Sequence, residues 1–114
     1  MKHVMKLHNE PYQLIKNGVK TIELRLYDEK RRTIAVGDEI EFVNTKNSNL
    51  SFRCCVLALH RFPTFKELYA ALPLLKCGYT ESNVAMANPI DMELYYTVEQ
   101  QQKYGVVGIE LKLL

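Results

Sequence analysis

Residues 20–27 read Lys-Thr-Ile-Glu-Leu-Arg-Leu-Tyr and form the cleanest two-residue alternation in the chain. Successive side chains of an extended strand point to opposite faces, so Ile22, Leu24 and Leu26 would share one buried face. The residues between them would share the opposite face. The pattern predicts a half-buried β-strand over 21–27, with charged side chains on its second face.

Four further strands are predicted on either side of this one. They are residues 1–7, 39–43, 51–62 and 106–113. Both faces of 51–62 are largely apolar, which indicates a central strand. The connections between the middle strands are shorter than the dozen or so residues that a parallel crossover needs, so most of the sheet should be antiparallel.

Helices are predicted between the strands. Asn9 should cap a short helix that has Pro11 in its first turn and ends at Asn17-Gly18. Capping-box patterns begin at Thr64 and Thr97, and another helical stretch begins at Asn88-Pro89.

These elements predict one α+β domain over residues 1–114. Closing a small sheet removes its exposed edges, so we expect a small, mixed, mostly antiparallel β-barrel with flanking helices. A chain of 114 residues is long enough to bury its own core. No apolar run approaches the roughly 20 residues that cross a bilayer, so no membrane span is expected.

The cysteines and histidines show no metal-site or disulfide spacing. They are Cys54, Cys55, Cys77, His3, His8 and His60. Adjacent cysteines on a strand point to opposite faces, and an odd number of cysteines fits a reducing compartment. We therefore expect a cytoplasmic protein with no metal and no cofactor, in which Cys54 and Cys55 are small core residues and His60 is structural.

Charge is distributed unevenly along a chain whose net charge is only +2. Residues 16–32 contain six basic and three acidic side chains, a local net of +3, whereas residues 77–102 carry four acidic side chains and no Lys or Arg. The basic stretch favours an anionic ligand, although a solvated loop would look the same. The acidic 77–102 segment is a candidate surface for a protein partner.

Three charged residues of the 20–27 stretch are candidates for binding. Lys20 and Arg25 could contact phosphate, and Glu23 could orient Arg25 or accept a hydrogen bond from a base. The alternative is a surface ion pair with little effect on stability.

Several motifs of this chain together resemble the ASCH (activating signal cointegrator homology) family. They are Lys6-Leu7, Pro11-Tyr12, Ile15-Lys16-x-Gly18, Lys20-Thr21-Ile22-Glu23-x-Arg25-Leu26-Tyr27-Asp28, Arg31-Arg32, Gly37-Asp38-x-Ile40-x-Phe42, Phe65-x-Glu67-Leu68 and Tyr95-Tyr96 through Lys103-Tyr104-Gly105-Val106-Val107-Gly108-Ile109.

The resemblance implies a PUA-like fold and the binding of RNA, or of a nucleotide-like ligand, in a basic cleft beside the barrel. The residues expected in that cleft are Lys20, Thr21, Glu23, Arg25 and Arg32. Arg31 would extend the basic rim, and the tyrosines at 27, 95, 96 and 104 could stack on bases or pack in the core.

The resemblance also leaves a hydrolase open. Some similar proteins remove the acyl group from N4-acetylcytidine with a lysine, a threonine three residues later and a glutamate from a later helical segment. Lys20 matches the lysine, but Glu23 occupies the threonine position, and Thr21 cannot simply replace it. In such an enzyme, Lys20 and Glu23 would be catalytic, with Glu23 activating water. The candidates for the later glutamate are Glu67, Glu81, Glu93 and Glu99.

Overall fold

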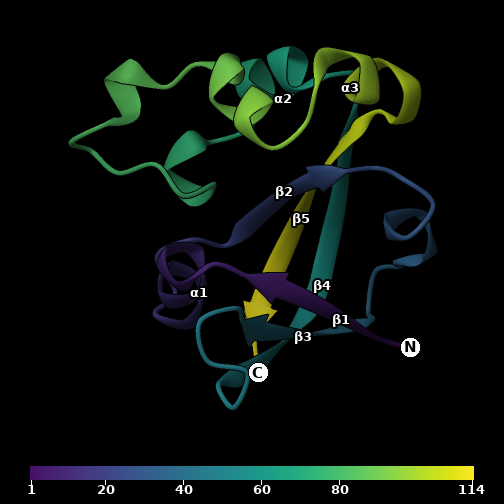
Figure 1. The fold of residues 1–114 in the computed structure, drawn as a ribbon, viewed down its shortest axis with the longest axis vertical. Coiled ribbons are helices and arrows are strands. Elements are labelled where there is room, and N and C mark those ends of the chain that lie inside the picture. Colours follow the sequence, from purple (N-terminus) through teal and green to yellow (C-terminus); the bar gives the residue numbers. More distant parts are fainter.

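The computed structural model describes residues 1–114 and contains one five-stranded sheet (Figure 1). Its strands are β1 (Lys2–Leu7), β2 (Ile22–Leu26), β3 (Glu39–Asn44), β4 (Ser51–Phe62) and β5 (Val106–Leu113). The order across the sheet is β1-β3-β4-β5-β2. The long strand β4 pairs with both β3 and β5, which confirms that it is central.

The sheet is mostly antiparallel, as predicted, because only β1 and β3 run parallel. It curls into a half-barrel, which confirms the α+β, PUA-like fold class. The strands β1 and β2 are its two edges and are not paired with each other. The barrel is therefore open along one seam, and β2 with its charged face borders that opening.

Each face of the sheet packs into its own apolar cluster. On one face, residues of β1, β3, β4 and β5 pack with α1 around Phe42 and Ile109, both fully buried. On the other face, Ile22, Leu24 and Leu26 of β2 pack with α2 around Phe65. The predicted alternation of β2 is confirmed, because its apolar residues all belong to the second cluster.

Three α-helices and four short 3-10 helices surround the sheet (Figure 1). The α-helices are α1 (Asn9–Lys16), α2 (Phe65–Ala71) and α3 (Val98–Tyr104). The 3-10 helices are η1 (Arg31–Thr33), η2 (Leu74–Lys76), η3 (Val84–Met86) and η4 (Pro89–Leu94). The capping boxes predicted at Thr64 and Thr97 are both formed. No helix of the structure has the length and apolar character needed to span a membrane.

One cap prediction was wrong. The residue before α1 is His8, which makes no capping bond through its side chain, and Asn9 is already helical. The Asn9 side chain is used elsewhere, since its Oδ1 accepts a hydrogen bond from Asn44 Nδ2 at 3.0 Å. A tertiary contact with the end of β3 therefore replaces the local cap.

Candidate binding cleft

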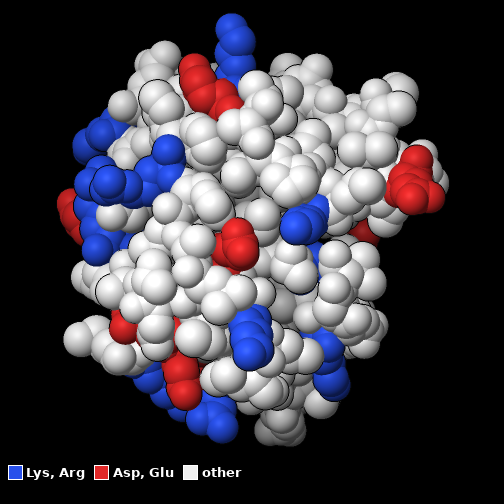
Figure 2. All heavy atoms as spheres, turned by 180° about the vertical axis from the view of Figure 1, so that it is seen from behind, with Lys and Arg blue, Asp and Glu red and all other residues white.

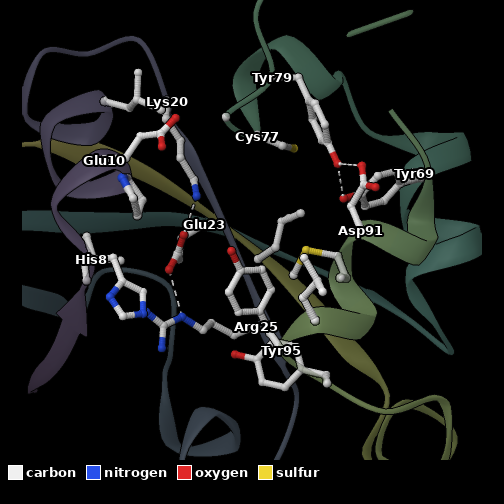
Figure 3. Close-up of a pocket in the computed structure, with 18 of the residues that line it drawn as sticks. His8, Glu10, Lys20, Glu23, Arg25, Tyr69, Cys77, Tyr79, Asp91 and Tyr95 are labelled. Carbon is white, nitrogen blue, oxygen red and sulfur yellow. Dashed lines mark hydrogen bonds and ion pairs between the residues drawn. The ribbon is translucent and has the colours of Figure 1, made fainter. Parts of the chain in front are cut away.

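A cleft of about 920 Å³ lies beside β2, at the open side of the half-barrel (Figure 3). Residues from the end of β1 and the start of α1 form one wall, including Lys6, His8 and Glu10. The opposite wall comes from residues 69–96. The floor is formed by Lys20 and by Glu23 and Arg25 of β2.

Three charged side chains meet on this floor. Glu23 Oε1 lies 2.7 Å from Lys20 Nζ, and Glu23 Oε2 accepts a hydrogen bond from Arg25 Nε at 2.8 Å. Glu23, which is paired with Ile109 of β5 in the sheet, is only 5% exposed although it lines the cleft. The two-residue spacing of a strand places Glu23 and Arg25 on one face, as the sequence predicted.

Burial by itself raises the pKa of the Glu23 carboxyl, but the charges of Lys20 and Arg25 outweigh it and the net shift is downward. Glu23 is therefore a carboxylate at neutral pH. Two cations against one anion leave one positive charge on the cleft floor.

Arg25 also bridges the seam of the barrel. Its Nη2 donates a hydrogen bond to the backbone oxygen of Lys6 at 2.9 Å. The edge strands β1 and β2, which share no backbone pairing, are thus connected through one side chain. Glu23 holds the guanidinium that makes this connection, so the floor of the cleft also helps to fix the curl of the sheet.

Lys20 is positioned by segments distant in sequence. The backbone N–H of Thr21 donates to Lys76 O at 2.9 Å, which attaches the residue after Lys20 to η2. The aliphatic part of Lys20 runs past Gly78, which has a φ of +112°. A Cβ at Gly78 would lie 3.4 Å from Lys20 Cδ, and its backbone conformation favours glycine.

The wall formed by residues 69–96 contains a series of hydrogen bonds that runs through two tyrosine hydroxyls. The Tyr79 hydroxyl donates to Asp91 Oδ2 at 2.7 Å and lies 2.7 Å from the Tyr69 hydroxyl. Because Tyr79 has given its only proton to Asp91, Tyr69 must be the donor to Tyr79. Burial raises the pKa of both phenols, so both remain protonated at neutral pH.

The rim of the cleft is apolar and open on the side of η4. Leu94 is 86% exposed and Tyr95 is 64% exposed, although both line the cleft. Tyr96 lies deeper and stacks on Phe65, with ring centroids 6.0 Å apart. Tyr95 and Leu94 therefore form a ledge at the entrance that a flat ligand could cover.

Two of the predicted site residues do not line the cleft. Thr21 contributes backbone hydrogen bonds to η2 and to β5. Arg32 lies on η1, where its Nη2 donates to Tyr104 O at 3.0 Å. Its neighbour Arg31 is paired with Asp28 at 2.9 Å. The cleft thus brings together Lys20, Glu23 and Arg25 but excludes Thr21 and Arg32.

None of the four candidate glutamates, Glu67, Glu81, Glu93 and Glu99, lines the cleft. Glu67 is engaged in the capping box of α2 with Thr64. The acidic side chains that do line the cleft are Glu10, Glu23 and Asp91. Nothing in the local sequence marks Asp91, Tyr79 or Tyr69 as partners, because only the fold brings their segments together.

The remaining candidates are outside the cleft or buried in it. His60 pairs with Glu110 at 2.9 Å across the sheet, and Cys54 is buried in the core. Cys77 lines the cleft, and burial raises the pKa of its thiol to about 11, so it is a neutral thiol. No group of three or more His, Cys, Asp or Glu side chains could hold a metal ion.

Comparison with known proteins gives one family. The sequence-family model of the ASCH domain matches residues 5–114 of this chain. The crystal structure of the hypothetical protein PH0355 is 34% identical with a TM-score of 0.82, covering 100% of both chains. The solution structure of protein PF0455 from Pyrococcus furiosus is 35% identical with a TM-score of 0.75, covering 100% of this chain and 98% of the other.

A more distant structure shares the fold alone. It is a mutant of the ZmASCH protein from Zymomonas mobilis, 15% identical with a TM-score of 0.68, covering 96% of this chain and 66% of that one. No curated protein matches this chain.

Proposed function

Because this chain belongs to the ASCH-domain family, we propose that it binds RNA, or a nucleotide-like ligand, with one nucleotide unit in the cleft beside β2. The observation that carries this proposal is the pairing of a cationic floor with an exposed aromatic ledge in one cleft. Its volume of about 920 Å³ lies within the range of small-ligand sites.

The floor suits an anionic or carbonyl-bearing part of the ligand. Lys20 has three N–H donors and uses one on Glu23, and Arg25 has donors beyond those given to Glu23 and Lys6 O. Their remaining donors could contact phosphate or base oxygens. Both oxygens of Glu23 are engaged, so its role in this proposal is to hold the two cations in place.

The ledge suits a base. Tyr95 and Leu94 expose large apolar surfaces to solvent. Stacking of a base on an aromatic side chain contributes about 1–3 kcal/mol of binding free energy per base. A base lying on Tyr95 would put its sugar and phosphate toward the floor. This arrangement would hold a single nucleotide whose base is unpaired.

The hydrolase alternative has weaker support from the site. A carboxylate whose pKa is lowered, and which is already bonded to two cations, is a poor general base for water. No hydroxyl occupies the position of the family's threonine, and Thr21 lies outside the cleft. We therefore favour binding over hydrolysis.

The test is a titration of fluorescent single-stranded RNA and of single nucleotides against four variants. Lys20→Met and Tyr95→Ala alter the cleft, and we expect each to weaken binding by about tenfold. Lys112→Met removes an exposed lysine of β5, and Ile90→Ala removes an exposed side chain from η4 outside the cleft. These two controls should bind like the wild type.

Unchanged binding by both cleft variants would show that the ligand binds elsewhere. The same preparations incubated with N4-acetylcytidine should release no cytidine. Release that is lost in Lys20→Met would instead assign hydrolysis to this cleft.

A further inference from the structure

A second basic surface lies just beyond the end of β2. It consists of Tyr27, Arg32, Arg61, Lys103 and Tyr104, which we call the arginine–tyrosine patch. The guanidinium carbons of Arg32 and Arg61 lie 4.5 and 5.3 Å from the centroid of the Tyr27 ring. Lys103 Nζ lies 5.1 Å from the centroid of Tyr104. Arg32 and Arg61, from two separate segments, thus share the Tyr27 ring, and Arg32 connects this ring to α3 through its hydrogen bond to Tyr104 O.

The three cations of the patch have no acidic partner. No carboxylate lies within 4.0 Å of Arg32, Arg61 or Lys103, and Glu99, one helical turn before Lys103, makes no ion pair with it. All three cations are exposed. Figure 2 shows Lys and Arg side chains gathered at its left, on the side of the molecule where η1 lies in Figure 1.

Arg32 and Arg61 both lie against the Tyr27 ring, so their like charges add over this part of the surface and favour a bound anion. Each keeps free donors, because Arg32 uses Nη2 on Tyr104 O and Arg61 uses Nη1 on the Tyr27 hydroxyl, at 3.0 and 3.4 Å. The fork of donors on arginine fits the oxygens of phosphate. The patch therefore has the charge and the donors of a phosphate-binding surface.

The patch continues the line of cations that begins in the cleft. Arg25 and Tyr27 are two residues apart on one face of an extended chain, so their Cα atoms are separated by about 7 Å. Burial raises the pKa of Tyr96, which lines the cleft; the charges of Arg25 and Arg31 act to lower this pKa, and those of Glu23 and Asp28 act to raise it. An RNA strand that left the cleft on this side would meet Arg32 and Arg61 next.

We propose that the arginine–tyrosine patch binds backbone phosphates of a single-stranded RNA whose neighbouring nucleotide occupies the cleft. This inference rests on the proposed function and narrows it, because the ligand is then an RNA strand rather than a free nucleotide. An oligonucleotide should bind more tightly than a single nucleotide. Three phosphate contacts to a single strand predict a slope of about −2 for log affinity against log salt.

The experiment compares a fluorescent single-stranded oligonucleotide with single nucleotides on the full chain, at several salt concentrations. Arg61→Gln removes a patch charge at one end of β4. Arg53→Gln removes an equal charge at the other end of the same strand and serves as the matched control. Arg32→Gln is a second patch variant. Thermal unfolding of each variant checks that it is folded.

We expect Arg61→Gln to weaken oligonucleotide binding by about tenfold at low salt and to reduce the salt slope by about 0.7. Arg32→Gln should act in the same direction. Binding of single nucleotides should be unchanged in both, and Arg53→Gln should resemble the wild type. This result would support the patch as part of the RNA site.

Three results would overturn the inference. Equal losses in Arg61→Gln and Arg53→Gln would reflect net charge alone. Full oligonucleotide affinity in both patch variants, with loss in Lys20→Met, would leave the cleft as the whole site and the proposed function intact. If the wild type bound neither oligonucleotide nor single nucleotides, the proposed function would fail together with the inference.

Discussion

The cleft floor and the arginine–tyrosine patch are both basic, and they adjoin each other along β2. Their cations differ in burial and in pairing with a carboxylate. On the floor, Lys20 and Arg25 are held by Glu23 at 2.7 and 2.8 Å and are largely buried. In the patch, Arg32 and Arg61 are exposed, lean on Tyr27 and have no acidic partner.

The difference follows from the cost of removing a charge from water. A buried cation without a partner is expensive, so the floor needs a carboxylate between its two cations. An exposed cation stays hydrated and can remain unpaired. The floor can therefore supply fixed geometry for one nucleotide, whereas the patch supplies exposed, unpaired positive charge that would attract a polyanion.

Removal of the carboxylate from the floor is expected to have the largest effect on stability. Glu23→Gln leaves Lys20 and Arg25 buried without an anion, and it should lower the free energy of unfolding by about 3 kcal/mol. Chemical denaturation with urea measures this loss. The matched control is Glu39→Gln, which breaks the exposed pair with Arg53 and should change stability by less than about 1 kcal/mol.

Similar losses in Glu23→Gln and Glu39→Gln would mean that the floor is solvated like the surface. The distinction between the two basic regions would then fail.

The stability contributed by Glu23 should also depend on pH. The folded-state pKa of Glu23 lies below its ordinary value of 4.5, so the ionised carboxylate contributes stability that is fully present above that value. The contribution is lost as the pH falls below 4.5 and through the lowered pKa. The difference in thermal stability between wild type and Glu23→Gln should therefore be constant near neutral pH and should narrow in acid.

Melting temperatures of both proteins between neutral pH and strong acid give this difference directly. A gap that stayed constant to the lowest pH would show that the carboxylate charge does not stabilise the floor.

The smallest effect is expected at Thr21. Its side chain lies outside the cleft although its neighbour Lys20 lies on the floor. Thr21→Ala should change the affinity for nucleotide or RNA by less than about twofold, as surface substitutions away from a site do. The titration used for Lys20→Met provides the comparison. A loss as large as that of Lys20→Met would place Thr21 in the site after all.

The sequence predicted the elements that depend on neighbours along the chain. The alternation of β2, the capping boxes at Thr64 and Thr97, and the end of α1 near Gly18 are all present. Each is decided by contacts within a few residues, so a local pattern is sufficient evidence. The cap at Asn9 was wrong because a distant partner, Asn44, competes for the same side chain.

One wall of the cleft could not be predicted from local sequence patterns. Lys20, Glu23 and Arg25 lie close together in sequence, and a strand is enough to put Glu23 and Arg25 on one face. Tyr69, Tyr79 and Asp91 belong to three segments with no shared spacing. None of the four candidate glutamates lines the cleft, because sequence periodicity does not show which carboxylates face it.

Local sequence patterns were sufficient to predict the five strands and three α-helices, the apolar face of β2 and the stretch that carries Lys20, Glu23 and Arg25. The three-dimensional fold was needed to show that the half-barrel stays open at β1 and β2, that Arg25 bridges this seam, and that Arg32 and Arg61 share the Tyr27 ring. This division follows from the range of the interactions involved. Hydrogen-bonded turns and side-chain alternation act over a few residues, whereas burial and ion pairing act between any residues that the fold brings together.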